Sequence, residues 1–376
     1  MVGGGERALF DLATGLARGA AFSPVVLCRQ SGPLVHALRQ AGVDTTVLPF
    51  PDRFRRGFWP VFSLLALAQV GRWRGRSGAA LVHSNGPFGL LYGGGAARLR
   101  RLPVVHTCHL PDDLSSAGKR VLLRIVPQRT LAVSEALARR LRDELGLAEQ
   151  RALHVPLGIE TMISPDVVEK GRALRRGQGW GPDCVVFGQV ARWQPVKGQA
   201  RFLDALDILC RRRTDVRAVL VGPSVSPGSP EAAWRQMVVE RIGRSQALGD
   251  GRVVVAEGSD EATVAAWMAA MDGLVVPSDA ESFGRVVLEA MAHGRPVIAT
   301  PCDGPVEILE QGVTGWLTPT WDPSDLAGAM ERLAGDRETG RAMGRQGRDV
   351  CGARCEVARP VQAVGAVYGG LLDHGG

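Results

Sequence analysis

The feature that most constrains the fold is an alternation of short apolar runs and helical patterns that occurs twice along the chain. Apolar runs of this length, separated by helical patterns, are typical of buried parallel strands joined by crossover helices. The sequence therefore predicts an α/β protein with two doubly wound, Rossmann-like units. In the first half, strands are expected at 24–28, 43–48, 79–83, 103–107, 130–134 and 152–155, and helices at 6–17, 34–41, 88–99 and 134–145. In the second half, from 184 to 349, strands are expected near 185, at 216–221 and 252–256, and near 274 and 297.

Length and charge support a division into two domains. The chain has 376 residues, of which 45% are hydrophobic and 22% are charged, which is ordinary for a globular protein of two domains. Residues 1–180 carry 25 basic and 13 acidic side chains, whereas residues 181–376 carry 20 basic and 25 acidic ones. We expect a first domain over 1–170, a linker over 160–181, a second domain over 181–354, and a terminal helical pattern within 355–376. The basic first half favours an acidic acceptor or lipid phosphate as partner.

Several classes of protein are excluded by composition. The seven cysteines are scattered and have no metal-ligand spacing, which indicates free thiols in a reducing compartment. We expect a cytoplasmic protein, since there is no leader-like start and no stretch of about 20 apolar residues. Nucleic acid is not an expected partner, because no basic patch is interleaved with aromatic residues.

Segment 57–70 leaves two interpretations open. It is apolar and has arginines on both sides, at positions 53, 55, 56, 72, 74 and 76. A helix that covers a sheet is the favoured interpretation. The other is a basic amphipathic helix on an anionic membrane, which would place the protein on the inner membrane face.

The stretch from 277 to 300, PSDAESFGRVVLEAMAHGRPVIAT, predicts a ligand site. It comprises the end of a strand at 273–277, a loop, a helix at 285–293 that Gly294 can end, and a second strand at 296–299. The start of this helix, near Phe283 and Gly284, would lie at the carboxyl edge of a parallel sheet, where phosphate binds well. Glu281 and Glu289 could then accept hydrogen bonds from ligand hydroxyls, although two solvated glutamates remain the alternative.

A second cationic element follows the predicted strand near 185. Arg192 and Lys197 bracket the loop after this strand, and Gly198 precedes a helical pattern. On spacing alone, a diphosphate site and two solvated cations are equally compatible with the pattern.

These two stretches, R-x4-K-G and E-x7-E, closely resemble retaining glycosyltransferases of family 4, the group 1 type with the GT-B fold. The resemblance implies two Rossmann-like domains facing a cleft and a terminal helix that returns to the first domain. It also implies that Arg192 and Lys197 neutralise the donor diphosphate, that Glu281 holds donor-sugar hydroxyls, and that Glu289 holds the ribose.

The segment PVVHTCHLPDD (103–113) carries two histidines that strand alternation places on opposite faces. A histidine here can donate to a sugar hydroxyl or guide the acceptor, or it can be a satisfied loop residue. The resemblance favours His109 as the residue against the donor sugar. His83 and Asn85 are weaker candidates for the acceptor side. Asp112 and Asp113 are too few to predict a metal site.

The chain begins with a glycine loop, MVGGGER, without a strand before it. Members of the resembling family have a strand there, so the first strand of the N-terminal domain is expected to be missing. The resemblance places Gly4 near the donor phosphates, and a disordered tail is the alternative for the glycine loop.

The resulting hypothesis is a retaining glycosyltransferase that uses a UDP- or GDP-sugar and a sugar or lipid-linked acceptor, in polysaccharide or glycolipid synthesis. No cofactor and no metal are expected. The competing hypothesis is a catalytically silent GT-B protein that binds sugar nucleotide or membrane. A nicotinamide dehydrogenase is remote, because no G-x-G-x-x-G follows a strand.

Overall fold

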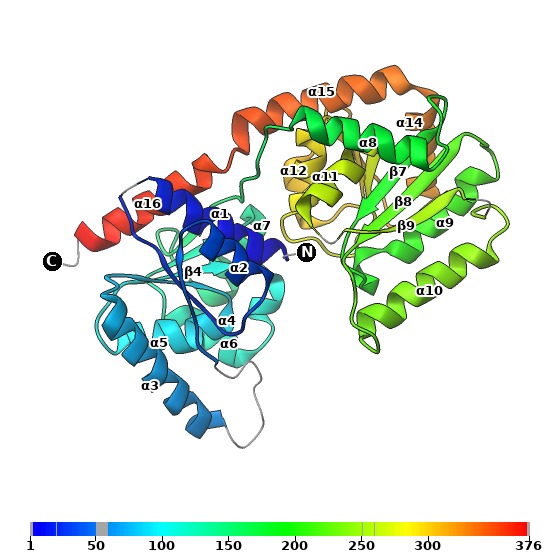
Figure 1. Ribbon diagram of the computed structural model, residues 1–376. Coiled ribbons are helices and arrows are strands. Elements are labelled where there is room, and N and C mark those ends of the chain that lie inside the picture. The colour runs from blue at the N-terminus through cyan, green and yellow to red at the C-terminus, as the bar shows by residue number, and fades with distance from the viewer. Residues whose placement is uncertain (1–2, 20, 50–58, 250, 259, 374–376) are drawn as a thin grey trace. The chain divides into compact units, whose positions relative to one another are not determined.

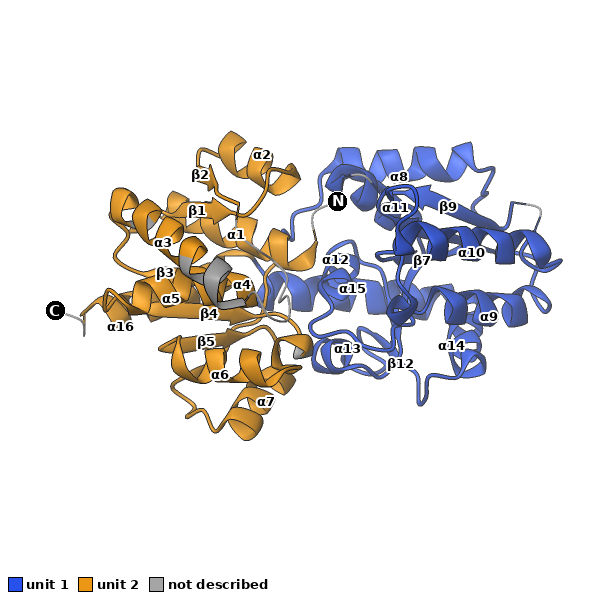
Figure 2. Ribbon diagram, turned by 90° about the horizontal axis from the view of Figure 1, so that it is seen from below, with its two compact units in different colours: residues 1, 159–356 blue, residues 2–158, 357–376 orange. Residues whose placement is uncertain are grey.

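The computed structural model describes residues 3–19, 21–49, 59–249, 251–258 and 260–373 (Figure 1). It divides the chain into two compact units, which Figure 2 shows in two colours. Unit 1 comprises residues 159–356, and unit 2 comprises residues 2–158 together with 357–376. Both units contain parallel strands covered by helices, so the α/β prediction is confirmed.

Unit 1 contains one six-stranded sheet in which every pair of neighbours is parallel. Its order is β12-β11-β10-β7-β8-β9, so the chain starts in the middle and extends first to one side and then to the other. Such a reversal makes a topological switch point between β7 and β10, outside their carboxyl ends. The strands are β7 (Val185–Val190), β8 (Val216–Gly222), β9 (Val253–Glu257), β10 (Gly273–Val276), β11 (Val297–Ala299) and β12 (Gly315–Leu317). Only β12, three residues long, was not expected.

Helices cover both faces of this sheet (Figure 1). On one face, α9 (Gln199–Cys210), α10 (Pro230–Arg244) and α14 (Pro323–Gly335) contribute to an extensive apolar core. Near the opposite face, α11 (Glu261–Ala270) packs on α8 (Pro165–Gly177), and α12 (Arg285–Ala292) packs on α15 (Arg337–Arg354).

The expected linker at 160–181 is therefore mostly a helix of unit 1. Gly171 allows this helix, α8, to pack closely on α11, because a Cβ at this position would lie 2.8 Å from the Ala269 side chain.

Unit 2 holds two separate parallel sheets instead of the single one expected. One pairs β1 (Val25–Cys28) with β2 (Asp44–Val47). The other has the order β3-β4-β5-β6. Its strands are β3 (Val82–Asn85), β4 (Val104–Cys108), β5 (Arg129–Ala132) and β6 (Ala152–His154). The residues described before the first helix, α1 (Gly4–Arg18), include no strand.

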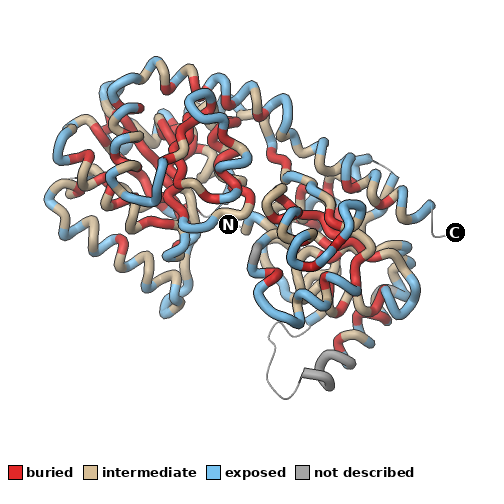
Figure 3. Tube along the Cα trace, turned by 180° about the vertical axis from the view of Figure 1, so that it is seen from behind, coloured by how far each residue is buried: buried red, intermediate tan, exposed pale blue. Residues whose placement is uncertain are grey.

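The terminal helix α16 (Ala358–Asp373) packs beside α1 over the four-stranded sheet. Leu16, Val105, Leu131, Val364 and Tyr368 form a common buried cluster there. A second cluster joins α1, β1, α2 (Pro33–Gln40) and Val43, the residue before β2. In Figure 3, buried segments run through the inside of each unit and exposed stretches recur along the helices.

The remaining helices of unit 2 are α3 to α7 and the short turns between them. Gly94 lies in a π-helical turn, and a Cβ there would lie 2.8 Å from the Val126 side chain, so close packing requires glycine at this position. None of the helices described is long and apolar enough to cross a membrane. The arginines at 53, 55 and 56 lie outside the described residues, so the membrane-surface interpretation of segment 57–70 stays a prediction. The helices are α3 (Trp59–Ser77), α4 (Pro87–Gly89), α5 (Gly95–Arg98), α6 (Ala117–Ile125) and α7 (Glu135–Leu145).

Candidate functional site

The loop after β7 brings Arg192 and Lys197 to the carboxyl edge of the unit 1 sheet. A short 3-10 turn, Pro195–Lys197, leads into α9 through Gly198, which has a positive φ of 69°. A Cβ on Gly198 would lie 1.9 Å from the carbonyl oxygen of Pro277, so only glycine fits this position. The backbone of the β7 loop thus lies directly against the end of β10.

The loop after β10 carries Glu281, Phe283 and Gly284. Phe283 is buried, and Gly284 begins α12 with a φ of 86°. Two backbone hydrogen bonds join this loop to its neighbours. Asp279 N donates to Val196 O at 2.8 Å, and Gly304 N donates to Glu281 O at 2.8 Å. Loops that follow β7, β10 and β11 therefore interlock at the switch point.

Arg201 ties the same two loops together and was not singled out from the sequence. Its guanidinium donates to Pro277 O at 2.5 Å and pairs with Asp279 at 2.6 Å. The sequence gives little indication of this role. Arg201 is one of many arginines in the chain, and its partner Pro277 lies 76 positions further along.

Lys197 and Glu281 form an ion pair with an Nζ to Oε2 distance of 2.6 Å. Their side chains are 16% and 19% exposed, so the pair is largely shielded from water. The sequence predicted Lys197 as a ligand of the diphosphate and Glu281 as a ligand of sugar hydroxyls. The structure places the two side chains in direct contact. Arg192, in contrast, is exposed and makes no side-chain ion pair with any described residue. The edge of the unit 1 sheet thus combines a neutralised pair with an uncompensated cation.

Glu289 lies on α12 and accepts from Arg285 Nε at 3.0 Å. Its side chain is 34% exposed, although its helix neighbours Leu288 and Ala290 are buried. The ion pair with Arg285 offsets the free-energy cost of placing a carboxylate in apolar surroundings. This partial exposure of the side chain would let a ligand hydroxyl reach it.

The corresponding edge of unit 2 holds Gly4 and His109. Helix α1 begins at Gly4, and a Cβ there would meet nothing within 4 Å, so packing within the unit does not require glycine. His109 directly follows β4 and is half-buried. Its Nε2 hydrogen-bonds Asn85 Oδ1 at 2.5 Å, and Asn85 Nδ2 donates to Gly5 O at 3.0 Å. Asn85 thereby joins α1, β3 and the end of β4. Burial lowers the pKa of His109 to about 4, so the imidazole is neutral at pH 7.

The other two histidines near this edge are held by hydrogen bonds to other residues of unit 2. His83 bonds the Tyr368 hydroxyl of α16 and, at 2.7 Å, the Thr107 hydroxyl. His106 is fully buried and bonds Ser84 Oγ through Nδ1 at 2.9 Å. Burial lowers the pKa of each to about 3. Both ring nitrogens of His83 thus have partners within unit 2, and its place beside an acceptor stays a prediction.

Three buried groups near His109 have metal-ligating atoms within 4.8 Å of one another: His106, Cys108 and Asp113. Their contacts serve another purpose, because Asp113 Oδ2 accepts from the backbone N–H of His109 at 3.2 Å and of Leu110 at 3.4 Å. Burial and the nearby Asp113 carboxylate raise the pKa of the Cys108 thiol, which favours the protonated form over a ligating thiolate. Asp113 is best understood as the anchor of the His109 loop.

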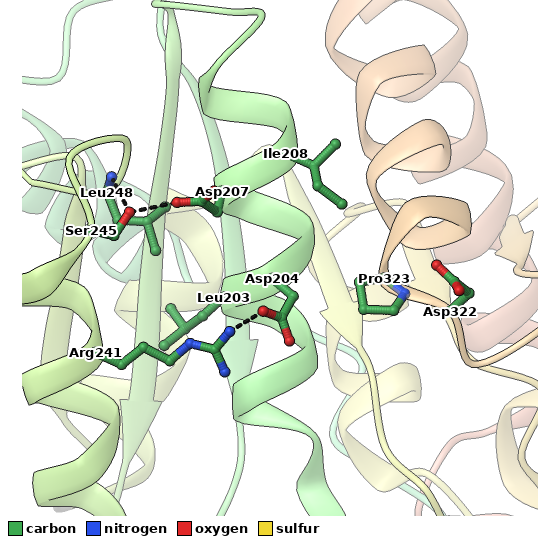
Figure 4. Close-up of a pocket in the computed structure, with 9 residues that line it drawn as sticks. All are labelled: Leu203, Asp204, Asp207, Ile208, Arg241, Ser245, Leu248, Asp322 and Pro323. Carbon is green, nitrogen blue, oxygen red and sulfur yellow. Dashed lines mark hydrogen bonds and ion pairs between the residues drawn. The ribbon is translucent and has the colours of Figure 1, made fainter.

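A cavity of about 460 Å³ lies elsewhere in unit 1, between α9, α10 and the start of α14 (Figure 4). Its polar groups have partners in the protein. Arg241 pairs with Asp204, and Ser245 donates to Asp207 at 2.5 Å. It contains none of the residues predicted for the donor, and it lies within the helix layer.

Two parallel-sheet units, with charged groups gathered at the switch point of one, define a protein of the GT-B class. Two family models match the chain: Glycosyltransferase Family 4 over residues 2–162 and Glycosyl transferases group 1 over residues 181–336. The chain therefore belongs to the group 1 glycosyltransferases of family 4.

Relatives and solved structures agree with this assignment. The chain is 30% identical over 259 residues to a D-inositol 3-phosphate glycosyltransferase of Paenarthrobacter aurescens, and 32% identical over 249 residues to one of Actinosynnema mirum. These alignments cover 65% and 62% of this chain, but only 61% and 58% of the relatives. The fold matches Anabaena Alr3699/HepE, solved with UDP and glucose, with a TM-score of 0.81, 22% identity and coverage of 98% and 96% of the two chains. Sucrose-phosphate synthase from Thermosynechococcus elongatus matches with a TM-score of 0.78, 22% identity and coverage of 99% and 94%.

Proposed function

We propose that the protein transfers a sugar from a nucleoside diphosphate sugar to a hydroxyl acceptor with retention of anomeric configuration. The observation that carries the proposal is the contact of Lys197 with Glu281, which joins the loop that also carries Arg192 to the loop that leads into α12, outside the carboxyl ends of β7 and β10. Ligands of open α/β sheets bind at such switch points, and helix starts favour phosphate.

The chemistry follows from the charge that develops as the glycosyl–phosphate bond breaks. The leaving group is an anionic diphosphate, which needs preorganised positive groups. Arg192 and Lys197 supply that charge from side chains, so the proposal requires neither metal nor cofactor. Glu281 then accepts hydrogen bonds from hydroxyls of the donor sugar, and Glu289 from those of the ribose. The acceptor hydroxyl attacks the face from which the diphosphate leaves, and a phosphate oxygen takes its proton.

A diphosphate can bind to Lys197 without breaking the Lys197–Glu281 pair. Lys197 Nζ has three N–H groups, of which Glu281 engages one, so the ammonium can bind a phosphate oxygen while it keeps this contact. The bound carboxylate stays oriented and accepts from a sugar hydroxyl with its second oxygen. The pair thus preorganises both groups before the donor binds.

The proposal includes UDP as the nucleotide and an anionic or lipid-linked hydroxyl as the acceptor. Solved structures of similar fold contain UDP and UDP-glucose, and the relatives are named for D-inositol 3-phosphate. The excess of basic residues in positions 1–180 supports an acidic acceptor or contact with an anionic membrane.

The test is release of free nucleoside diphosphate from UDP-, GDP- and ADP-sugars, with inositol 3-phosphate, a lipid-linked acceptor in vesicles, or no acceptor. We expect turnover with a UDP-sugar that resists EDTA, and a product whose anomeric configuration, read by NMR coupling constants, is that of the donor. Binding of UDP without release from any donor and acceptor pair would instead indicate a silent binding protein. A product of inverted anomeric configuration would refute retention but would leave the proposed sugar transfer intact.

A further inference from the structure

The hydrogen bonds around Asn85 determine which nitrogen of His109 carries the proton. Asn85 ends β3 and lies beside Thr107 in the register of β3 and β4, so its side chain reaches the same sheet edge as His109. One end of its amide contacts Gly5 O at 3.0 Å, and the other contacts His109 Nε2 at 2.5 Å.

The chemistry of the partners orients this amide without ambiguity. A backbone carbonyl can only accept, so the NH₂ group of Asn85 must face Gly5. Its carbonyl oxygen then faces His109, and because that oxygen can only accept, Nε2 must carry the hydrogen. In a neutral imidazole the other nitrogen, Nδ1, then bears the lone pair.

The backbone of His109 is held independently of its ring. Asp113 accepts from the N–H groups of His109 and Leu110, while Gly5 lies against the imidazole face, with an ideal Cβ 3.6 Å from Cγ and Cδ2. The ring is therefore located by its backbone on one side and by Asn85 at Nε2. Its Nδ1 has no hydrogen-bond partner among the residues that the structure describes.

We propose that Asn85 is a positioning residue that holds His109 as the neutral Nε2–H tautomer and presents Nδ1 as a hydrogen-bond acceptor. His109 then accepts a hydrogen bond from a hydroxyl of the sugar substrate and does not donate one. Its part in binding a sugar rests on the proposed function, whereas the tautomer does not. This reverses the direction of the hydrogen bond first considered from the sequence.

Charged and titratable groups surround the ring on several elements. His83 interacts electrostatically with His109. Asp11 of α1 and His109 line a common small pocket of unit 2, Asp11 pairs with Arg7 at 2.8 Å, and Asp113 accepts from the backbone N–H of His109. Burial keeps the pKa of His109 at about 4 in this setting. A carboxylate in place of the Asn85 amide would favour the charged imidazolium and raise that pKa.

The experiment is nitrogen NMR of histidine-labelled full-length protein, with the seven histidine signals assigned by substitution. In the wild type we expect a protonated Nε2 and an unprotonated Nδ1 for His109 from pH 8 down to about 5. Asn85→Asp should raise its pKa by about 1 unit or more, and Asn85→Leu should abolish the single tautomer. Ser84→Ala is the matched control, since it removes the comparable bond to His106 and should leave the His109 signals unchanged.

An Nδ1–H tautomer in the wild type, or an unshifted His109 titration in folded Asn85→Asp, would overturn the proposal. Circular dichroism and melting temperature establish that each variant is folded. In the turnover assay, Asn85→Leu should lower kcat about tenfold with little change in KM, as loss of one oriented hydrogen bond implies. The NMR outcome stands even if no donor is turned over, so failure of the tautomer and failure of the glycosyltransferase proposal are distinguishable.

Discussion

The two units present opposite chemistry at the carboxyl edges of their parallel sheets. In unit 1 the edge carries ions: Lys197 paired with Glu281, Arg285 paired with Glu289, and an exposed Arg192. In unit 2 the histidines at this edge and beneath it are neutral, because burial lowers their pKa values to between about 3 and 4, and the nearby carboxyl groups of Asp11 and Asp113 accept hydrogen bonds within the unit. The same architecture can therefore prepare one edge for an anion and the other for neutral hydroxyls, as the proposed transfer of a sugar from a diphosphate requires.

The largest expected effect concerns the close packing that builds the unit 1 edge. Gly198→Ala would place a methyl group 1.9 Å from Pro277 O in a left-handed conformation. We expect a loss of about 3 kcal/mol or more in the free energy of unfolding, measured by urea denaturation. Gly228→Ala is the matched control, because Gly228 has a φ of 76° but open space around it. It should cost only about 1–2 kcal/mol, and equal losses in both variants would mean that the Pro277 contact has no energetic role.

The charged character of the unit 1 edge is tested by Lys197→Ala. The variant removes a cation and leaves Glu281 unpaired beside the incoming diphosphate, so kcat/KM should fall roughly 10- to 100-fold. Arg212→Ala is the control, since Arg212 forms an exposed pair with Glu331 on the same unit and should change kcat/KM by less than about twofold. Wild-type turnover by Lys197→Ala would remove the main support for the donor assignment.

Glu289→Ala should have a smaller effect, about tenfold in kcat/KM, because one charged hydrogen bond is lost at a partly exposed site. If Glu289 binds the ribose, the variant should also bind UDP more weakly than the wild type does. Titration of UDP by calorimetry provides the readout, and Glu310→Ala, which breaks the exposed pair with Arg354, is the comparison. Unchanged UDP affinity would exclude Glu289 from the nucleotide site.

The neutral state of the buried histidines in unit 2 can be tested by measuring stability at low pH. At pH 7 this substitution, His106→Phe, should have the smallest effect of those proposed. His106 has a folded pKa of about 3 against an unfolded value near 6.5, so its contribution to stability is present above pH 6.5 and is lost as the pH falls toward 3. His106→Phe replaces a buried ring whose Nε2 has no partner. It should leave stability at pH 7 within about 1 kcal/mol and make the protein more resistant to acid unfolding. A steeper loss of stability in acid than for the wild type would contradict the neutral state of His106.

Sequence patterns predicted the order and type of most elements in each unit. The strand, loop and helix proposed around residues 277–299 agree with β10, α12 and β11 within one or two residues, because apolar runs and glycine ends are local signals. The helix at 165–177 lies where the sequence predicts a linker, because its contacts with α11 depend on residues nearly 100 positions away. The separation of β1 and β2 from the other strands of unit 2 depends on pairing that no local pattern encodes.

Residue types and spacing also located the candidate donor groups at one sheet edge, because successive parallel strands must end on the same side. Only the tertiary structure decided how these groups are used. Lys197 and Glu281 are 84 positions apart, and His83 and Tyr368 are 285 apart, so their pairing follows from chain topology and not from any local preference. The same holds for Asn85, which is 24 positions from His109 and 80 from Gly5. Composition and spacing determined which chemistry is available to this protein, and packing decided which charges neutralise one another and which nitrogen of His109 stays open to a ligand.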